Sequence, residues 1–425
     1  MTKPVSSSAS SPAPLRSPLL ILLCGCLIAM ATFGPRSTMG LFTTPITSER
    51  GFSLELFSFA MAIQNLLWGL GQSFAGAVAD RFGSTRVLAV GLIVYAAGLA
   101  IMAYASDPWS FNLSAGVLIG FGLSGCSFNL VLAAFGKLMP ERWRGTAIGA
   151  GSAAGSFGQF VFAPASSLLI RSVGWSNTLL IFAGLMILAV PLTLALWTPR
   201  LATSPTPGST NPPAGVGALS QQTLRQALAE AFGHRSYVLL VMGFFVCGFH
   251  LAFVTIHLPK FLIEQGLTPE VGGWTLALIG LFNIVGSLGS GMLGNRIPKR
   301  WLLSGIYLGR AIAIALFVSF PITNTSALMF GAALGLLWLS TIPPTSGLIA
   351  IMFGTRWLAM LYGFAFFSHQ VGSFVGLVIA AWTREVYGSY DIIWWLGVLL
   401  GLLAAIVNMP IRETPVDRAA TVPAE

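Results

Sequence analysis

Long apolar segments separated by short polar stretches make up most of the chain. Each segment has about 20 residues or more, the length that an α-helix needs to cross the hydrocarbon core of a bilayer. Twelve segments are expected, near residues 19–44, 55–79, 87–105, 110–136, 145–170, 176–197, 238–263, 271–294, 301–321, 325–353, 357–383 and 391–411. The pattern predicts an all-α membrane protein with twelve transmembrane helices.

The twelve segments form two groups of six. The expected organisation is an N-terminal tail, an N-terminal six-helix bundle, a linker, a C-terminal six-helix bundle and a C-terminal tail, at residues 1–18, 19–197, 198–237, 238–411 and 412–425. The linker begins with a stretch rich in Pro, Ser, Thr and Gly, which disfavours regular structure. It ends with QQTLRQALAEAFGHRSY, which predicts a short amphipathic helix.

Composition supports a membrane protein. Of the 425 residues, 55% are hydrophobic and 8% are charged, and the mean hydropathy is +0.81, whereas soluble domains carry about 25% charged residues. The net charge of +9 does not come from dense basic clusters, so no nucleic-acid partner is predicted. The four cysteines lie in apolar segments without metal-ligand spacing, and neither a metal nor another cofactor is expected.

The distribution of basic residues predicts the orientation. With twelve spans and the N-terminus inside, sixteen of the 22 Lys and Arg residues fall in cytoplasmic loops and tails, and four fall outside. Cytoplasmic loops of membrane proteins carry this excess of positive charge. We therefore expect a multi-pass protein of a bacterial-type inner (plasma) membrane with both termini cytoplasmic. Arg36 and Arg310 remain within the apolar segments.

The two halves resemble each other. AAGSFGQF in the fifth segment matches QVGSFVGL in the eleventh, and the loop GAVADRFGSTR after the second matches GSGMLGNRIPKR after the eighth. Such internal repeats are typical of secondary transporters, whose binding site lies between the halves near the middle of the bilayer. The repeats predict pseudo-two-fold symmetry.

GAVADRFGSTRVL, residues 76–88, resembles the loop motif of the major facilitator superfamily, and ERWRG after the fourth segment resembles its charged partner. The resemblance covers about residues 19–411. It implies the major facilitator fold with two six-helix bundles, a transport function and no enzyme activity. It also implies a gating role for a charge network of Asp80, Arg81, Arg86, Arg142 and Arg144.

FGPRSTMGLF, residues 33–42, resembles the first helix of the monocarboxylate transporter family, in which Arg36 occupies the position of a functional lysine. FGKLMPERWRGTAIGAGSAAG, residues 135–155, resembles the second signature of that family. Asn283 and Ser287 stand where the family's eighth helix carries an Asp and an Arg. Arg36 is then the one family-matched cation for an anionic substrate.

An ionisable side chain at membrane depth is costly, so each one is a functional candidate. The thirteen acidic residues can all be placed in loops or at segment ends, so Arg36 has no predicted counter-charge. A substrate carboxylate would match its guanidinium, although Arg36 could instead extend towards the outer interface. For Arg310, pairing with carbonyls or a phenol and contact with substrate are equally compatible with the sequence.

Three histidines lie within apolar segments. His250 and His257 are seven residues apart, which places them about two turns apart on one helix face. His250 and His369 are the candidates for proton coupling, because histidine titrates near neutral pH. Each could instead bond to a neighbouring helix, which is the favoured interpretation for His257.

Several polar residues within the apolar segments could complete a binding site. Individually, such residues more often join helices than bind ligands. The predicted substrate-binding set is Arg36, Asn129, Gln159, His250, Asn283, Tyr362, His369 and Gln370. Gln64 and Asn65 are further cavity candidates.

The predicted function is transport of a small organic anion, with a monocarboxylate favoured, by alternating access coupled to a proton or a counter-anion. One alternative is an efflux antiporter for hydrophobic or drug-like compounds, although the fifth segment lacks the Gly-Pro pair usual in superfamily antiporters. An alternative from another class is a non-transporting membrane sensor. The expected partners are the substrate, the coupling ion and the lipid bilayer, and nothing in the sequence indicates an oligomer.

Overall fold

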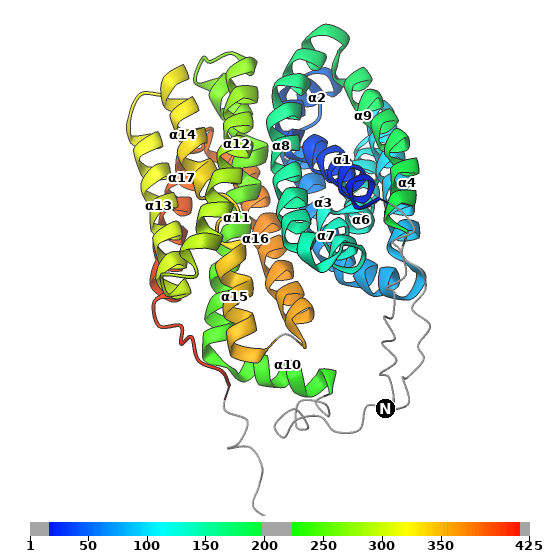
Figure 1. Cartoon of the computed structure of the whole chain (residues 1–425). Coiled ribbons are helices and arrows are strands. Elements are labelled where there is room, and N and C mark those ends of the chain that lie inside the picture. The colour runs from blue at the N-terminus through cyan, green and yellow to red at the C-terminus, as the bar shows by residue number, and fades with distance from the viewer. Residues whose placement is uncertain (1–16, 198–222, 355, 417–425) are drawn as a thin grey trace, which may run out of the picture.

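The computed structural model describes residues 17–197, 223–354 and 356–416. Within these ranges the chain is helical and contains no strands, and the helices form two bundles side by side (Figure 1). The side chains of Ser73, Asp80 and Leu224 also lie outside the described part. Most of each expected tail and most of the linker lie outside the described residues, but α10 (Leu224–Gly233) confirms the predicted amphipathic helix.

The first bundle contains the first six apolar segments. Its elements are α1 (Pro18–Ser37), η1 (Met39–Phe42), α2 (Thr43–Arg50), α3 (Leu54–Phe82), α4 (Ser84–Tyr104), α5 (Pro108–Phe111), the π-helical η2 (Asn112–Leu118), α6 (Ile119–Cys126), α7 (Phe128–Leu138), α8 (Glu141–Val173), α9 (Trp175–Ala189) and η3 (Val190–Leu196). Gly83 joins α3 to α4 at a φ of 93°, so this turn favours glycine. The loop motif thus forms a tight turn between α3 and α4.

The second bundle contains the other six segments. Its elements are α11 (Arg235–Glu264), α12 (Pro269–Leu293), α13 (Lys299–Ser319), α14 (Asn324–Leu336), α15 (Ile342–Phe353), α16 (Leu358–Tyr387) and α17 (Asp391–Asn408). In the described part, eleven helical segments are long and apolar enough to cross a membrane. The remaining segment is divided between α14 and α15, which are each too short to span alone.

Three apolar segments contain breaks rather than one continuous helix. The first breaks at Thr38, between α1 and η1, and the fourth breaks at Ser127, whose ψ of 150° is not helical. The tenth breaks between Leu336 and Ile342, just before two consecutive prolines. Proline lacks the N–H that would continue a helix but fits the first turn of the next one.

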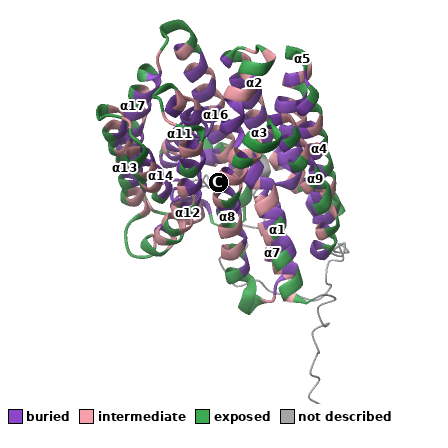
Figure 2. Ribbon diagram, turned by 90° about the horizontal axis from the view of Figure 1, so that it is seen from above, coloured by how far each residue is buried: buried purple, intermediate pink, exposed green. Residues whose placement is uncertain are grey.

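Side-chain burial fits a bundle surrounded by lipid. Seen from above, buried residues face the interior of the molecule and exposed residues lie on its outer faces (Figure 2). Many exposed residues are large and apolar, including Phe74, Leu168, Leu188, Met292 and Met329. In water such a surface would associate, whereas a bilayer solvates it.

The bundles meet mainly through two helix pairs, α3 with α16 and α8 with α12, and η1 and α2 also contact α11. We call the end of the molecule at α2 the α2 end and the opposite end the α10 end (Figure 1). At the α2 end, Arg171 pairs with Glu270 at 3.2 Å and the Glu55 amide donates to Glu385 at 2.9 Å.

The α2 end is also closed by direct backbone packing between the bundles. A Cβ on Gly40 of η1 would overlap the Thr255 carbonyl of α11, so only glycine permits this approach. Contacts between the bundles therefore close the α2 end.

Candidate functional site

A central cavity lies between the bundles and has about 630 Å³ of empty space, counting its open side. In the described part, the first bundle contributes six lining residues and the second contributes twelve. They are Phe33, Arg36, Ser37, Trp68, Phe128, Gln159, Phe244, Cys247, Leu251, Ala252, Thr255, Trp338, Leu339, Ile342, Tyr362, Phe366, His369 and Ser373.

Arg36 is the cationic residue of the cavity wall, on the last turn of α1. Its Nη2 donates to Asn65 Oδ1 at 2.5 Å, and its guanidinium lies 4.3 Å from the centre of the Trp68 ring. The Asn65 amide is itself held by the Met61 carbonyl at 2.8 Å. Within the described residues, Arg36 Nε is buried and has no hydrogen-bond partner. Arg36 is therefore oriented by neutral groups and can still bind an anion.

Two helices begin at the cavity wall. Phe128 is the first residue of α7 and Ile342 is the first residue of α15, and both line the cavity. The N-terminus of a helix carries a partial positive charge. The breaks in the fourth and tenth segments thus bring two such ends to the cavity that contains Arg36, while the described lining includes no Asp or Glu.

On the opposite wall, His369 of α16 lies between two aromatic rings. Its ring stacks on Phe366 at 5.7 Å and lies 5.1 Å from Phe244. Its Nδ1 is buried and has no hydrogen-bond partner among the described residues. Tyr362 of the same helix also lines the cavity. Of the predicted binding residues, Arg36, Gln159, Tyr362 and His369 thus share one cavity.

Two amide side chains, Gln159 on the cavity wall and Asn283 behind it, join the bundles. Gln159 Nε2 donates to the Leu276 carbonyl at 3.1 Å, from α8 to α12. Asn283 Nδ2 donates to Ser156 Oγ at 2.8 Å, and its Oδ1 accepts from the Leu339 amide at 2.9 Å. Asn283 is fully buried and does not line the cavity. It connects α8 to the break in the tenth segment.

The structure places the other predicted binding residues beside the cavity rather than on its wall. His250 faces α17 and lies 2.8 Å from the Gly397 carbonyl. Gln370 is fully buried against Gly69 of α3, and its amide atoms have no partner in the described part of the chain. Asn129 is half-buried and follows Phe128. Among the earlier cavity candidates, Gln64 donates to the Ala115 carbonyl at 2.8 Å.

His257 lies at the closed α2 end. Its Nε2 is 3.3 Å from Ser58 Oγ of the first bundle, and its Nδ1 is 3.2 Å from the Tyr390 hydroxyl of the second. The side chain is fully buried. This arrangement matches the interpretation of His257 as a helix-joining residue.

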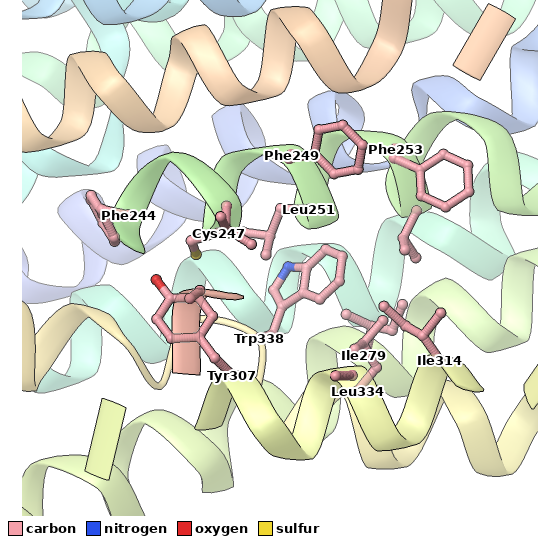
Figure 3. Packing of buried hydrophobic residues seen from close by; sticks show 14 of the residues in the cluster. Phe244, Cys247, Phe249, Leu251, Phe253, Ile279, Tyr307, Ile314, Leu334 and Trp338 are labelled. Carbon is pink, nitrogen blue, oxygen red and sulfur yellow. The ribbon is translucent and has the colours of Figure 1, made fainter. Parts of the chain in front are cut away.

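Arg310 is fully buried and does not line the cavity. Its Nε and Nη2 donate to the Leu337 carbonyl at 3.0 and 2.6 Å, and Nη2 also donates to the Trp338 carbonyl. Its guanidinium lies 5.5 Å from the Tyr307 ring. Figure 3 shows Tyr307, Cys247 and Trp338 gathered between α11, α13 and the break. Of the two alternatives, the structure matches pairing with carbonyls.

The predicted gating arginines lie at the α10 end. Arg81 is on the last turn of α3, Arg86 on the first turn of α4, and Arg142 and Arg144 on the first turn of α8; all four are exposed. The Asp80 side chain lies outside the described residues. The gating role therefore stays a prediction.

Sequence reasoning did not select most of the aromatic lining. Phe33 precedes Arg36 by three residues, Trp68 follows Asn65 by three, and Phe366 precedes His369 by three. Residues three apart share a helix face, so this spacing was a usable signal. It is weak in a membrane protein, because aromatic residues at the same spacing also pack against helices or face lipid.

The fold and the cavity define a polytopic helical membrane protein with a small-molecule cavity between two bundles. The chain belongs to the Major Facilitator Superfamily, whose family model matches residues 21–377. Membership makes it a multi-pass transport protein rather than an enzyme, and it confirms the predicted superfamily and fold class. The chain therefore handles a small-molecule substrate within a lipid bilayer.

Individual relatives are distant. The uncharacterized MFS-type transporter YcxA of Bacillus subtilis is 24% identical over 396 residues, with 92% of this chain and 94% of the relative covered. Monocarboxylate transporter 12 of Xenopus laevis is 25% identical, with 80% and 77% covered. A crystal structure of a D-xylose-proton symporter covers 94% of this chain and 99% of its own, with a TM-score of 0.68 and 17% identity. The last similarity shows the fold alone.

Proposed function

We propose that this chain is a secondary transporter of a small organic anion, with a monocarboxylate as the favoured substrate. The main supporting observation is Arg36, which is oriented at the cavity wall by Asn65 and Trp68 but has no carboxylate partner. A guanidinium binds a carboxylate with two parallel hydrogen bonds. Relatives named monocarboxylate transporters support the same substrate class.

Transport follows alternating access, in which the two bundles rock around the central cavity. Contacts at the α2 end would separate when the α10 end closes. The charge network of Asp80, Arg81, Arg86, Arg142 and Arg144 is proposed to hold the α10 end closed. Bringing the anion to Arg36 neutralises a buried charge, which lowers the cost of closing the cavity.

Coupling is proposed to a proton or a counter-anion. Of the two histidine candidates, His369 has the better position, because it lines the cavity and its Nδ1 has no partner in the described part of the chain. His250 lies against the Gly397 carbonyl instead. Exchange of one carboxylate for another at Arg36 would need no protonatable residue.

The remaining features of the topology are also proposals. We propose an inner-membrane monomer with both termini and the linker, including α10, on the cytoplasmic side. The bundles are assigned to residues 19–197 and 238–411. In this orientation the α10 end faces the cytoplasm, and the closed α2 end faces outward.

The test is transport by purified protein in proteoliposomes. Labelled lactate and pyruvate are supplied under an inward proton gradient and, in a separate assay, to proteoliposomes that contain the same unlabelled acid, with external benzoate as an unlabelled competitor. Arg36→Ala is expected to lose at least about 90% of the specific flux, because an uncompensated anion then has to enter a low-dielectric cavity. Arg296→Gln, which removes an exposed arginine, is the matched control. Normal accumulation by Arg36→Ala would contradict the proposed role.

The seven aromatic side chains among the described lining residues favour one alternative, an efflux antiporter for hydrophobic compounds. The two functions differ in their dependence on substrate charge. If benzamide competes as well as benzoate in wild-type protein, and Arg36→Ala binds both, the antiporter is supported. If benzamide fails to compete, the carboxylate is required.

A further inference from the structure

We propose that the preferred substrate is a carboxylate with a flat aromatic body, and not a short aliphatic acid such as lactate. This inference rests on the proposed function, because Arg36 is taken to bind the carboxylate. It goes further because it infers the chemical nature of the rest of the substrate from the residues of the other cavity walls.

Both bundles present aromatic rings to the cavity. Trp68 of the first bundle and Phe366 of the second meet at 5.3 Å with an interplanar angle of 79°. Phe33 and Phe128 form a second edge-to-face pair at 5.8 Å and 78°. Aromatic rings favour offset and edge-to-face contacts with another ring. The cavity therefore presents aromatic rings from both bundles to a bound ligand.

The second bundle adds a continuous apolar wall. Phe244, His369 and Phe366 are in ring contact with one another, with His369 between the other two. Trp338, Leu339 and Ile342 extend the wall along the break between α14 and α15. Figure 3 shows Phe244, Cys247 and Leu251 along α11, with Trp338 beside them. A ligand that bridges the bundles must cover this apolar surface.

Two of the four hydroxyl side chains in the described lining are committed to the backbone. Ser37 Oγ donates to the Gly34 carbonyl at 2.7 Å. Ser373 Oγ is 3.1 Å from both the Gly248 and His369 carbonyls. Among the polar lining groups that remain, Arg36 is the fixed cation, so a ligand carboxylate is expected there.

The number of aromatic side chains in the lining points to the same ligand class. A three-carbon acid at Arg36 would present little more than one methyl group to seven described aromatic side chains. Because apolar burial contributes in proportion to the area removed from water, a ring gains far more from this cavity.

The experiment measures binding, because uncharged benzoic acid crosses membranes by itself. Purified full-length protein in detergent is titrated by calorimetry with benzoate, lactate, pyruvate and benzamide. Benzoate is expected to bind about tenfold or more tightly than lactate. Trp338→Leu and Phe244→Leu are each expected to weaken benzoate binding by about tenfold and lactate binding by less than about twofold.

Trp382→Leu is the matched control, because Trp382 is half-exposed on α16 and does not line the cavity. It should change neither affinity. We call Trp338→Leu and Phe244→Leu the wall variants; unchanged lactate binding shows that such a variant is still folded. If lactate and benzoate bind equally in wild type, or if both weaken equally in the wall variants, the aromatic preference is overturned while the anion function stands. If benzamide binds as tightly as benzoate, the anion function itself fails.

Discussion

Arg36 and Arg310 are two arginines within apolar segments, one in each bundle, with different surroundings. Arg310 donates three hydrogen bonds to the carbonyls of Leu337 and Trp338, which follow the end of α14. Arg36 donates one, to an asparagine side chain, and lines the cavity. Each has one buried guanidinium nitrogen without a partner among the described residues.

The difference lies in what holds each charge. The last carbonyls of a helix lack intrahelical donors, and a cation near that end is stabilised by the helix dipole. Arg310 donates to such carbonyls and lies near the C-terminal end of α14, so its charge stabilises the chain at the break. Arg36 is held by a neutral amide and a tryptophan face, so its charge is only partly compensated. A buried charge therefore indicates ligand binding only when local backbone groups have not already satisfied it.

The largest expected effect is on stability, from Arg310→Leu. The variant leaves two carbonyls at the break without their donor, which should cost about 3 kcal/mol. The measurement is thermal unfolding of purified protein in detergent, with Arg296→Gln as the control. An Arg310→Leu protein that melts like wild type would show that the break does not depend on this arginine.

The next effect is on binding, from Asn65→Asp. The new carboxylate would lie against Arg36 Nη2, where Asn65 Oδ1 now accepts at 2.5 Å. It would compete with the substrate and weaken benzoate binding by about tenfold or more at neutral pH. The adjacent guanidinium keeps this aspartate ionised wherever benzoate is ionised, so the loss of affinity should persist across that pH range, which titration calorimetry checks.

Asn65→Leu separates charge from loss of the hydrogen bond. It removes the partner of Arg36 without adding a charge, and the expected loss of affinity is about threefold to fivefold. Equal losses in both variants would show that Asn65 orients Arg36 and that counter-charge is unimportant.

A smaller effect is expected on stability from Arg36→Ala. Its charge is incompletely compensated, so its removal should change the free energy of unfolding by no more than about 1 kcal/mol. The same variant should lose the thermal stabilisation that benzoate gives to wild type. A loss of unfolding free energy as large as that of Arg310→Leu would show that Arg36 is a structural residue. The contrast between the two arginines would then not hold.

The smallest effect is expected from Arg171→Gln at the α2 end. Arg171 pairs with Glu270, but its side chain is 79% exposed. Exposed ion pairs contribute little, so unfolding should change by at most about 0.5 kcal/mol. Thermal unfolding at low and high salt checks this, and a larger salt-sensitive loss would show that this pair holds the bundles together.

Much of the fold could be predicted because lipid imposes a local rule. A segment that crosses a bilayer must be apolar and must satisfy its own backbone, so its helical structure follows from length and hydropathy. The superfamily, the fold class and the α10 helix were predicted in this way or by resemblance, and are confirmed. The breaks at Ser127 and near Trp338 were not predicted, because both lie within apolar runs of ordinary hydropathy.

The candidate site was predicted only in part. Arg36, Gln159, Tyr362 and His369 do line one cavity, but their roles in binding stay predictions. His250 and Asn283 lie elsewhere, because one face of a helix meets the cavity while its other faces meet neighbouring helices. Apolar helices have little amphipathic pattern, so the sequence does not distinguish the face at the cavity from the faces that pack against other helices.

The amino-acid sequence by itself determined that this chain is a twice-repeated set of apolar helices with a cation in the first and ninth segments. It also placed the acidic residues at segment ends. Only the tertiary structure decided that Arg310 binds the end of a broken helix and that Arg36 faces a cavity lined by aromatic rings. The physical reason is that hydropathy depends on each residue alone, whereas the partners of a buried charge come from helices far away in the chain.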